Sequence, residues 1–170
     1  MSQGEPLAKN ASFALYEEIC DLGEGGFGCV KKYKNKFTGN EVAIKFMDFR
    51  SADTPEDIQR IFSEINLLRG LNHPNIVNLV DAFPLGQSMT FVMELCGGGE
   101  LQHYLKDVGP LPEEEVYSIA NQTCEGVRYW HNSKIIHRDL KLENILFADA
   151  MKMRIKIVDF GIAGISAKAV

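Results

Sequence analysis

Short apolar runs separated by polar and glycine-containing turns fill the first half of the chain. Runs of this length, bounded by turn residues, are typical of β-strands. They predict five strands, at residues 13–22, 29–34, 41–47, 76–83 and 89–95. The first three follow one another through tight turns, so we expect them to form an antiparallel meander.

One amphipathic helix interrupts the series of strands. Thr54 can cap its start, Pro55 suits the first helical position, and Gly70 can end it. The apolar residues between them recur at helical spacing: Ile58, Ile61, Phe62, Ile65 and Leu68. Residues 13–95 therefore predict a five-stranded sheet with one main helix.

The pattern changes after three consecutive glycines, at 97–99, which sustain neither a strand nor a helix. The spacing then predicts helices at 100–106 and 112–131 and short apolar segments at 135–136, 145–147 and 155–158. We expect the longer helix to direct five residues inward: Val116, Ile119, Ala120, Val127 and Trp130. The fold class is α+β, with a flexible N-terminal tail at 1–15 and two lobes at 16–96 and 97–170.

Composition narrows the class of protein. An apolar content of 45% in 170 residues excludes wholesale disorder, and a net charge of -5 argues against a nucleic-acid partner. The four cysteines form no CxxC pair, which argues against a zinc site or disulfide framework and fits a reducing compartment. The start of the chain lacks a signal-peptide layout, and no run of 18 apolar residues occurs. We therefore expect no membrane partner and a cytoplasmic location, with the nucleus as the alternative.

A glycine cluster carries the first candidate chemistry. Gly23, Gly25 and Gly28 form a GxGxxG pattern, which alone is weak because glycine clusters are more often simple turns. A strand follows Gly28 where a dinucleotide site would have a helix, and the chain lacks the GK[ST] of a Walker loop. A hairpin with a glycine loop can place backbone N–H groups over phosphates.

Lys45 and Glu64 are candidates for holding those phosphates. Lys45 alternates with Ala43, so both lie on one face of their strand, where an ammonium group can bind phosphate oxygens. Glu64 lies on the core-facing side of its helix, where a carboxylate is costly unless it is paired, so it is the candidate partner of Lys45. A solvated strand lysine and a solvated rim glutamate are the alternatives.

Two motifs in the second half give the strongest chemical signal: His137-Arg138-Asp139-Leu140-Lys141-Leu142-Glu143-Asn144 and Asp159-Phe160-Gly161. Asp139 can accept the proton of an attacking hydroxyl, and Lys141 can neutralise a transferring phosphoryl group. Asn144 and Asp159 offer the oxygen ligands that Mg²⁺ prefers. Each motif alone is an ordinary loop, but chance does not account for all of them in this order.

Together these motifs resemble the eukaryotic-type protein kinases over residues 16–170. The resemblance implies a bilobal fold: a five-stranded antiparallel N-lobe with one main helix, and an incomplete helical C-lobe. That C-lobe comprises the hinge linker, two helices, the catalytic loop, the DFG motif and the start of the activation loop.

The resemblance also assigns roles to residues. It implies ATP and Mg²⁺ as cofactors, with Asn144 and Asp159 as metal ligands. The catalytic residues it implies are Lys45, Glu64, Asp139 and Lys141. The residues it places around ATP are Leu22, Gly23, Gly25, Gly28, Val30, Ala43, Lys45, Met93, Glu94, Cys96, Glu100 and Leu146.

Lys141 after His-Arg-Asp resembles the serine/threonine branch, in particular the calmodulin-dependent-kinase-like group. Glu100 and Glu143 occupy positions whose acids, in such kinases, favour substrates with basic residues near the target hydroxyl. The alternative is that both are merely acids on the nucleotide side or at the surface. The same resemblance places Cys29 and Cys96 at the nucleotide pocket. It also implies an apolar spine formed by Leu68, Leu79, His137 and Phe160.

The sequence departs from the family in length, because no Ala-Pro-Glu follows the DFG motif. We therefore expect the first lobe to form and the second to be loose or to need a partner. Two functions stay open: phosphoryl transfer from ATP to Ser or Thr hydroxyls of protein substrates, or a catalytically incompetent truncated kinase that binds ATP or a partner. A dinucleotide-dependent oxidoreductase is rejected because a strand follows Gly28. The oligomeric state is open.

Overall fold

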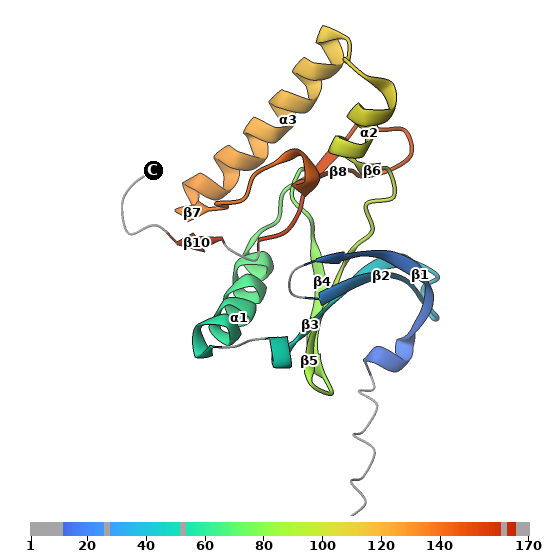
Figure 1. Ribbon diagram of the computed structural model, residues 1–170, viewed down its shortest axis with the longest axis vertical. Coiled ribbons are helices and arrows are strands. Elements are labelled where there is room, and N and C mark those ends of the chain that lie inside the picture. The colour runs from blue at the N-terminus through green and yellow to red at the C-terminus, as the bar shows by residue number, and fades with distance from the viewer. Residues whose placement is uncertain (1–11, 26–27, 52–53, 161–162, 166–170) are drawn as a thin grey trace, which may run out of the picture. The chain divides into compact units, whose positions relative to one another are not determined.

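The computed structural model describes residues 12–25, 28–51, 54–160 and 163–165 (Figure 1). The chain forms two compact units, Met1–Ile58 with Val80–Glu94, and Gln59–Leu79 with Leu95–Val170. This division differs from the lobes expected at 16–96 and 97–170, because the segment Gln59–Leu79 clusters with the second unit.

The first unit contains a five-stranded sheet in the order β1-β2-β3-β5-β4. Its strands are β1 Tyr16–Gly25, β2 Gly28–Asn35, β3 Glu41–Asp48, β4 Leu79–Leu85 and β5 Ser88–Glu94. The pairs β1 with β2, β2 with β3, and β3 with β5 are antiparallel, which confirms the predicted meander. The strand expected at 76–83 begins later, because Ile76 forms an isolated parallel bridge with Ile157 instead.

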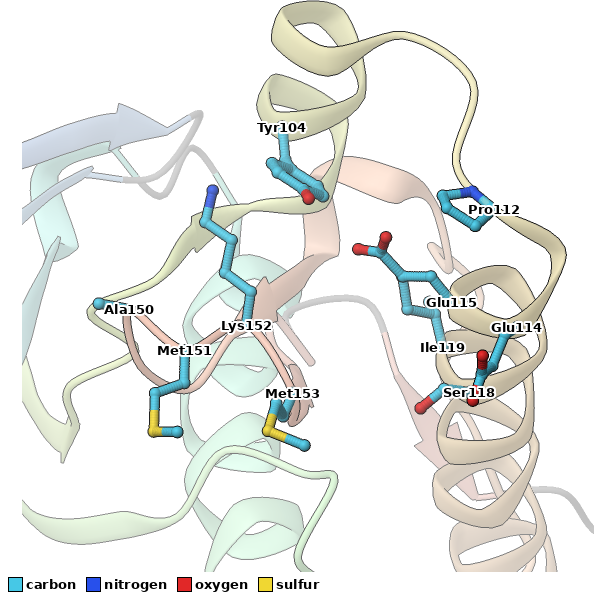
Figure 2. Close-up of a pocket in the computed structure, with 10 residues that line it drawn as sticks. All are labelled: Tyr104, Pro112, Glu114, Glu115, Ser118, Ile119, Ala150, Met151, Lys152 and Met153. Carbon is cyan, nitrogen blue, oxygen red and sulfur yellow. The ribbon is translucent and has the colours of Figure 1, made fainter.

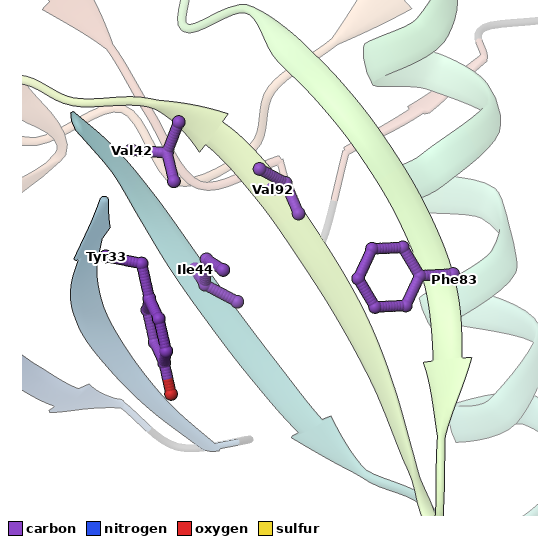
Figure 3. Packing of buried hydrophobic residues seen from close by; sticks show 5 residues of the cluster. All are labelled: Tyr33, Val42, Ile44, Phe83 and Val92. Atoms are coloured by element: carbon purple, nitrogen blue, oxygen red, sulfur yellow. The ribbon is translucent and has the colours of Figure 1, made fainter. Parts of the chain in front are cut away.

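One face of this sheet carries an apolar core, shown in Figure 3. The cluster consists of Tyr33, Val42, Ile44, Phe83 and Val92. Val42 and Ile44 alternate along β3 and so point to this face, while Phe91 and Met47, on the other face, are also buried. The ring of Phe13 lies 5.6 Å from that of Tyr33. Phe13–Leu15, expected in the flexible tail and at the start of a strand, forms the short 3-10 helix η1 instead, and the strand begins at Tyr16.

The predicted helix is α1, Pro55–Gly70, and the structure caps its start as the sequence predicts. Oγ1 of Thr54 accepts a hydrogen bond from the backbone N–H of Asp57 at 3.2 Å, and Oδ2 of Asp57 accepts one from the backbone N–H of Thr54 at 3.2 Å. This reciprocal pair satisfies two donors at the helix start. Among its apolar residues, Ile61, Ile65 and Leu68 are buried, whereas Ile58 and Phe62 are exposed.

The second unit combines the part of α1 from Gln59 onward with two further helices and short strands. The helices are α2, Leu101–Val108, and α3, Glu113–Asn132. One sheet joins β6 Gly99–Glu100, β8 Ile145–Phe147 and β9 Ile155–Ile157, and a second pairs β7 Ile135–Ile136 with β10 Gly164–Ile165. The helices and apolar segments predicted after the glycine run are therefore present.

Asn75 ties the segment that follows α1 to this second unit. Its side-chain amide donates to the carbonyl of Ile155 at 3.1 Å and to Oε1 of Gln122 at 2.9 Å. Its own carbonyl accepts a hydrogen bond from the N–H of Ile157 at 2.9 Å. These polar contacts join residues about 50 to 80 positions apart, and the apolar pattern of the sequence does not indicate them. The sequence therefore predicts the boundary between the two lobes at a different place, after residue 96.

Burial along α3 is uneven. Trp130 is 1% exposed, and a Cβ atom at Gly126 would lie 3.0 Å from Cδ1 of Ile157. Val116 is 50% exposed and Ala120 is also exposed, so the expectation that they face inward is wrong for the described part of the chain. The inward side of a helix depends on its neighbours, and the β9 residues Ile155 and Ile157 lie against α3 at Gln122 and Gly126, beyond Val116 and Ala120. No helix in the described ranges combines the length and apolar character needed to cross a membrane.

Candidate active site

The sheet face opposite the apolar core gathers four of the side chains predicted to contact a nucleotide. Directly opposed residues of an antiparallel pair point to the same face. Val30 lies opposite Lys45, and Ala43 lies opposite Met93. Lys45 and Ala43 alternate on β3, so all four share one face. Nζ of Lys45 is 5.9 Å from the ring centre of Phe91, which lies opposite it on β5.

The glycine hairpin joins β1 to β2 at one end of that face. Gly25 pairs with Gly28, and the tip at 26–27 lies outside the described residues. Gly28 has a φ of 154°, and a Cβ there would come 1.7 Å from the carbonyl oxygen of Phe46. A Cβ at Gly23 would have nothing within 4 Å. Close approach of two backbones therefore requires glycine at 28, whereas position 23 has room for a side chain.

Three other predicted residues of the first unit are placed less centrally. Leu22 is 49% exposed on β1, and Glu94 ends β5. Cys29 lies opposite Phe46, on the core face of the sheet. Neighbouring residues of a strand point to opposite faces, so Cys29 does not share the face of Val30. The prediction that Cys29 lines the nucleotide pocket is therefore wrong.

Glu64 is buried, as its position on α1 predicts. It is 2% exposed and lies on the helix side that also buries Ile61, Ile65 and Leu68. A carboxylate at this depth is stable only with polar or charged partners. The alternative of a solvated rim glutamate is therefore excluded, and the pairing of Glu64 with Lys45 stays a prediction.

His137 anchors the loop that carries the strongest chemical signal. It is 2% exposed, and its Nε2 lies 3.1 Å from the carbonyl oxygen of Val158. Its Nδ1 accepts a hydrogen bond from the N–H of Asp139 at 3.3 Å, so Nε2 carries the proton in the neutral ring. Burial lowers the pKa of His137, against the opposing effect of the bond to Val158. A neutral imidazole therefore connects the backbone at Asp139 to the backbone at Val158, the residue before Asp159.

The backbone is strained at two positions of this loop system. Arg138 has a φ of 67° and Asp159 a φ of 63°, in the left-handed region that side chains other than glycine rarely adopt. Each such residue costs about 1–3 kcal/mol and persists only where the surroundings hold it. Because His137 precedes one of them and bonds to the residue before the other, it is well placed to hold both.

Asp139, Lys141 and Asn144 form a hydrogen-bonded cluster in the loop and the following 3-10 helix η3, Leu142–Asn144. Nζ of Lys141 lies 3.0 Å from Oδ2 of Asp139. The side-chain amide of Asn144 donates to the same Oδ2 at 3.0 Å and to the carbonyl of Asp139 at 2.7 Å. The bond from Lys141 is the main cause that lowers the pKa of Asp139, and the same bond raises the pKa of Lys141. The carboxylate is thus ionised and oriented.

Asn144 also connects this cluster to the DFG segment. It is 6% exposed, and its carbonyl accepts a hydrogen bond from the N–H of Val158 at 2.9 Å. Since its amide nitrogen faces Asp139, its amide oxygen is the end turned away from that carboxylate. Asp159 follows Val158 directly, so the two predicted metal ligands are tied by one backbone bond. Gly161 lies outside the described residues.

Three buried aromatic rings back this arrangement. The ring centre of Trp130 lies 5.4 Å from that of His137 and 5.5 Å from that of Phe160. His137 and Phe160 are 4.6 Å apart. The sequence places Trp130 inward but assigns it no part in the site. Trp130 precedes His137 by seven positions and lies on the predicted inward side of its helix. These two features are the sequence signal that could have indicated its role behind the loop.

The remaining predicted residues of the second unit lie around β6 and β8. Glu100 is directly opposite Leu146 in the β6–β8 pair, so their side chains share a face. Cys96 is partly buried. The backbone N–H groups of the next two residues, Gly97 and Gly98, donate to the carbonyls of Ala148 and Phe147 at 3.0 and 3.1 Å. The pairing of Glu100 with Leu146 brings together two residues that the resemblance places around ATP.

Arg138 packs against a glycine on β10. A Cβ atom at Gly164 would lie 2.0 Å from an Nη atom of Arg138, so the guanidinium fills the space that any side chain there would take. Gly164 lies opposite Ile136 on β7, the residue before His137. The strand pair and the arginine therefore support the start of the loop.

The predicted residues thus fall into two sets, one in each unit. The first set is the sheet face with Val30, Ala43, Lys45 and Met93. The second is the cluster around Asp139, joined through Asn144 and Val158 to Asp159.

Comparison with known proteins supports the same assignment. The family model described as "Protein kinase domain" matches residues 16–169. The chain is 41% identical over 159 residues to Myosin light chain kinase 3 of Homo sapiens, covering 91% of this chain and 19% of that protein. Myosin light chain kinase 3 of Pongo abelii gives the same identity and coverage. The chain therefore spans about a fifth of the length of the curated relatives it matches.

Proposed function

Because the chain belongs to the protein kinase family, we propose that it transfers the γ-phosphoryl group of ATP to serine or threonine hydroxyls of proteins. The observation that carries this proposal is the cluster in which Lys141 and Asn144 both bond to Oδ2 of Asp139. Phosphoryl transfer needs positioned groups and charge neutralisation more than covalent help from the protein, and this cluster supplies both.

Asp139 is the residue that would receive the substrate hydroxyl. Its pKa is lowered, chiefly by the hydrogen bond from Lys141, so it stays ionised at neutral pH and is a weak base. A weak base suffices because the transition state is loose and the hydroxyl proton leaves late. Asp139 therefore orients the hydroxyl and accepts its proton as the new bond forms. Lys141, 3.0 Å away, neutralises charge on the transferring group.

The residues present fit a magnesium ion. Mg²⁺ prefers oxygen ligands and keeps several waters, so one carboxylate and one amide oxygen suffice beside substrate phosphates. Asp159 and Asn144 would supply these ligands. Within the described ranges no group of three or more His, Cys, Asp or Glu side chains gathers to form an all-protein metal cage. When bound, the ion neutralises phosphate charge and aligns the γ-phosphoryl group.

The first unit supplies groups suited to the nucleotide. The shared face of Val30, Ala43 and Met93 offers apolar surface for the adenine ring, with Lys45 on the same face for the phosphates. In the second unit, Leu146 and Glu100 share a face that offers an apolar contact and a ribose acceptor. We propose that these residues bind ATP.

We propose protein substrates with basic residues near the target hydroxyl. Glu143 is half-buried in η3, two positions after Lys141, and Glu100 is exposed on β6. Both acids therefore belong to elements that carry other proposed site residues. The similar human protein is named as a kinase of myosin light chain. That name concerns the relative, and for this chain the proposal is limited to the chemical class of the substrate.

A transfer assay tests the proposal. The chain is incubated with Mg²⁺, γ-labelled ATP and two sets of serine- and threonine-containing peptides, with and without flanking arginines, and ATP binding is measured in parallel by equilibrium dialysis. We expect labelling that Asp139→Asn lowers about 10²–10⁴-fold while ATP binding persists. ATP binding without labelling above the Asp139→Asn control would instead support the alternative of a nucleotide-binding module.

A further inference from the structure

A hollow of about 470 Å³ lies within the second unit, apart from every residue assigned above to nucleotide or phosphoryl chemistry. Its walls are α2 at Tyr104, the first half of α3, and the turn at 150–153 between β8 and β9 (Figure 2). We call it the α2–α3 hollow. Its volume is that of a site for a few side chains rather than for a whole domain surface.

The turn that forms one wall is braced. Oδ1 of Asp149 accepts a hydrogen bond from the N–H of Met151 at 3.0 Å, and its Oδ2 lies 3.2 Å from Arg154. From α3, Nε2 of Gln122 donates to the carbonyl of Met153 at 3.0 Å. Backbone and side-chain bonds therefore hold the turn in place, from within and from the neighbouring helix.

This braced turn presents two methionines to solvent. Met151 is 76% exposed and Met153 is 69% exposed. Together with the hollow beside them, these two side chains offer an apolar surface that another molecule can contact. Methionine suits such a contact because its flexible thioether adapts to different apolar partners.

The opposite wall is acidic. Glu114 and Glu115 line the hollow from the first turn of α3, and Figure 2 shows the Glu115 carboxylate directed towards Tyr104. Burial, followed by the charge of Glu115, raises the pKa of the Tyr104 hydroxyl. The one lysine of the lining, Lys152, has its Nζ 3.9 Å from the ring centre of Tyr104. That ammonium lies over the ring of Tyr104. The wall formed by α3 therefore carries the negative charge of Glu114 and Glu115.

Acidic residues at a helix start have an ordinary explanation, since they stabilise the positive end of the helix. That explanation does not cover the methionines opposite them, nor the hollow between the two walls. We propose that the α2–α3 hollow docks a short segment of a partner protein that carries an arginine or lysine beside one or two aliphatic side chains. The cation faces Glu114 and Glu115, and the aliphatic groups pack on Met151 and Met153.

Peptide selection tests this without assuming a partner. A random peptide library is displayed and selected on the whole 170-residue chain, and enriched peptides are synthesised with a fluorophore for anisotropy titration. We expect enriched sequences to place Arg or Lys within a few positions of Leu, Ile, Val or Met. Both the double variant Met151→Ala/Met153→Ala and the double variant Glu114→Gln/Glu115→Gln should weaken their binding about tenfold.

Matched controls separate the hollow from general surface effects. Glu56→Gln removes an acid from the first turn of another helix, and Val80→Ala trims an exposed apolar residue elsewhere. Both should leave peptide affinity unchanged, as should Asp139→Asn, which alters the catalytic cluster. Thermal unfolding of each variant verifies folding, and the glutamate variants keep the test valid if the methionine variant unfolds.

Several results would overturn the proposal. One is a selection that yields no saturable binder, or binders without basic residues. Another is a set of binders whose affinity ignores both hollow variants, or that Asp139→Asn abolishes, since these peptides would occupy a different place. A concentration-dependent dimer in sedimentation, broken by Met151→Ala/Met153→Ala, would assign the hollow to a second copy of the chain instead.

Discussion

The sheet face of the first unit and the Asp139 loop of the second present functional side chains by two different means. On the sheet, regular register alone brings Val30, Ala43, Lys45 and Met93 to one side. In the loop, two residues with positive φ are held by hydrogen bonds through His137 and by buried rings. A face made by register tolerates change at many positions, whereas a strained loop depends on a few groups that fix it.

The largest effect is expected where the loop depends on packing. Trp130→Ala removes a fully buried ring that contacts His137 and Phe160, and should lower the free energy of unfolding by about 3–5 kcal/mol. Urea denaturation followed by circular dichroism measures this. Tyr117→Ala, on the same helix but 72% exposed, is the control and should change little. Equal losses in the two variants would mean that the ring stack is not a support of the loop.

The next effect tests the tightest point of the sheet. Gly28→Ala places a Cβ 1.7 Å from a backbone oxygen at a positive φ, and should cost about 2–4 kcal/mol of stability. Gly23→Ala meets nothing within 4 Å and should cost less than about 1 kcal/mol. Thermal unfolding of the two variants decides between them, and a similar loss in both would contradict the register described for β2 and β3.

Lys45→Met sharpens the assignment of the sheet face to phosphate binding. Loss of a charged hydrogen bond costs about 1.5–3 kcal/mol, so ATP affinity should fall roughly 10- to 100-fold. At an ATP concentration near the Kd of the parent, the stabilisation by Mg²⁺-ATP in thermal unfolding should then nearly disappear. Lys34→Met, an exposed lysine on β2, is the matched control. An unchanged ATP-induced shift in Lys45→Met would mean that the nucleotide binds elsewhere.

The smallest effect concerns protonation of the loop anchor. Burial lowers the pKa of His137 from its usual 6.5, so the unfolded chain binds a proton more readily than the folded one. Stability should therefore fall as pH drops below about 6.5, by up to about 1.4 kcal/mol per pH unit for this group.

The measurement is the slope of unfolding free energy between pH 7 and 5. His137→Phe should flatten this slope, whatever its effect on absolute stability. His73, whose pKa burial also lowers, keeps its share of the slope in both proteins. An identical slope in His137→Phe and the parent would refute the buried neutral state.

Local rules allow much of this structure to be predicted. Alternation predicts the sheet and the shared face of Ala43 and Lys45, and helical spacing predicts that Glu64 is buried. The parts that escape prediction depend on neighbours distant in sequence. Asn75 moves the segment after α1 into the second unit through polar contacts, and Val116 is exposed because no described element covers it. Cys29 does not share the face of Val30, because neighbouring side chains of a strand point to opposite faces.

The site shows the same division. Motif spacing identifies Asp139, Lys141 and Asn144, because their chemistry resides in the residue types themselves. It does not identify the contribution of Trp130, since a ring that never touches substrate carries no chemical signature. Nor does it indicate the space at Gly164 that Arg138 fills, which exists only once β10 pairs with β7.

Trp130 is the only tryptophan of the chain. Its buried indole is packed against the ring of Phe160, which follows Asp159, so the tryptophan emission of the chain arises from a single place beside the DFG segment. Displacement of Phe160 would alter the surroundings of the indole and hence the wavelength and intensity of that light. The protein therefore contains its own unlabelled optical probe of the ring that adjoins Asp159.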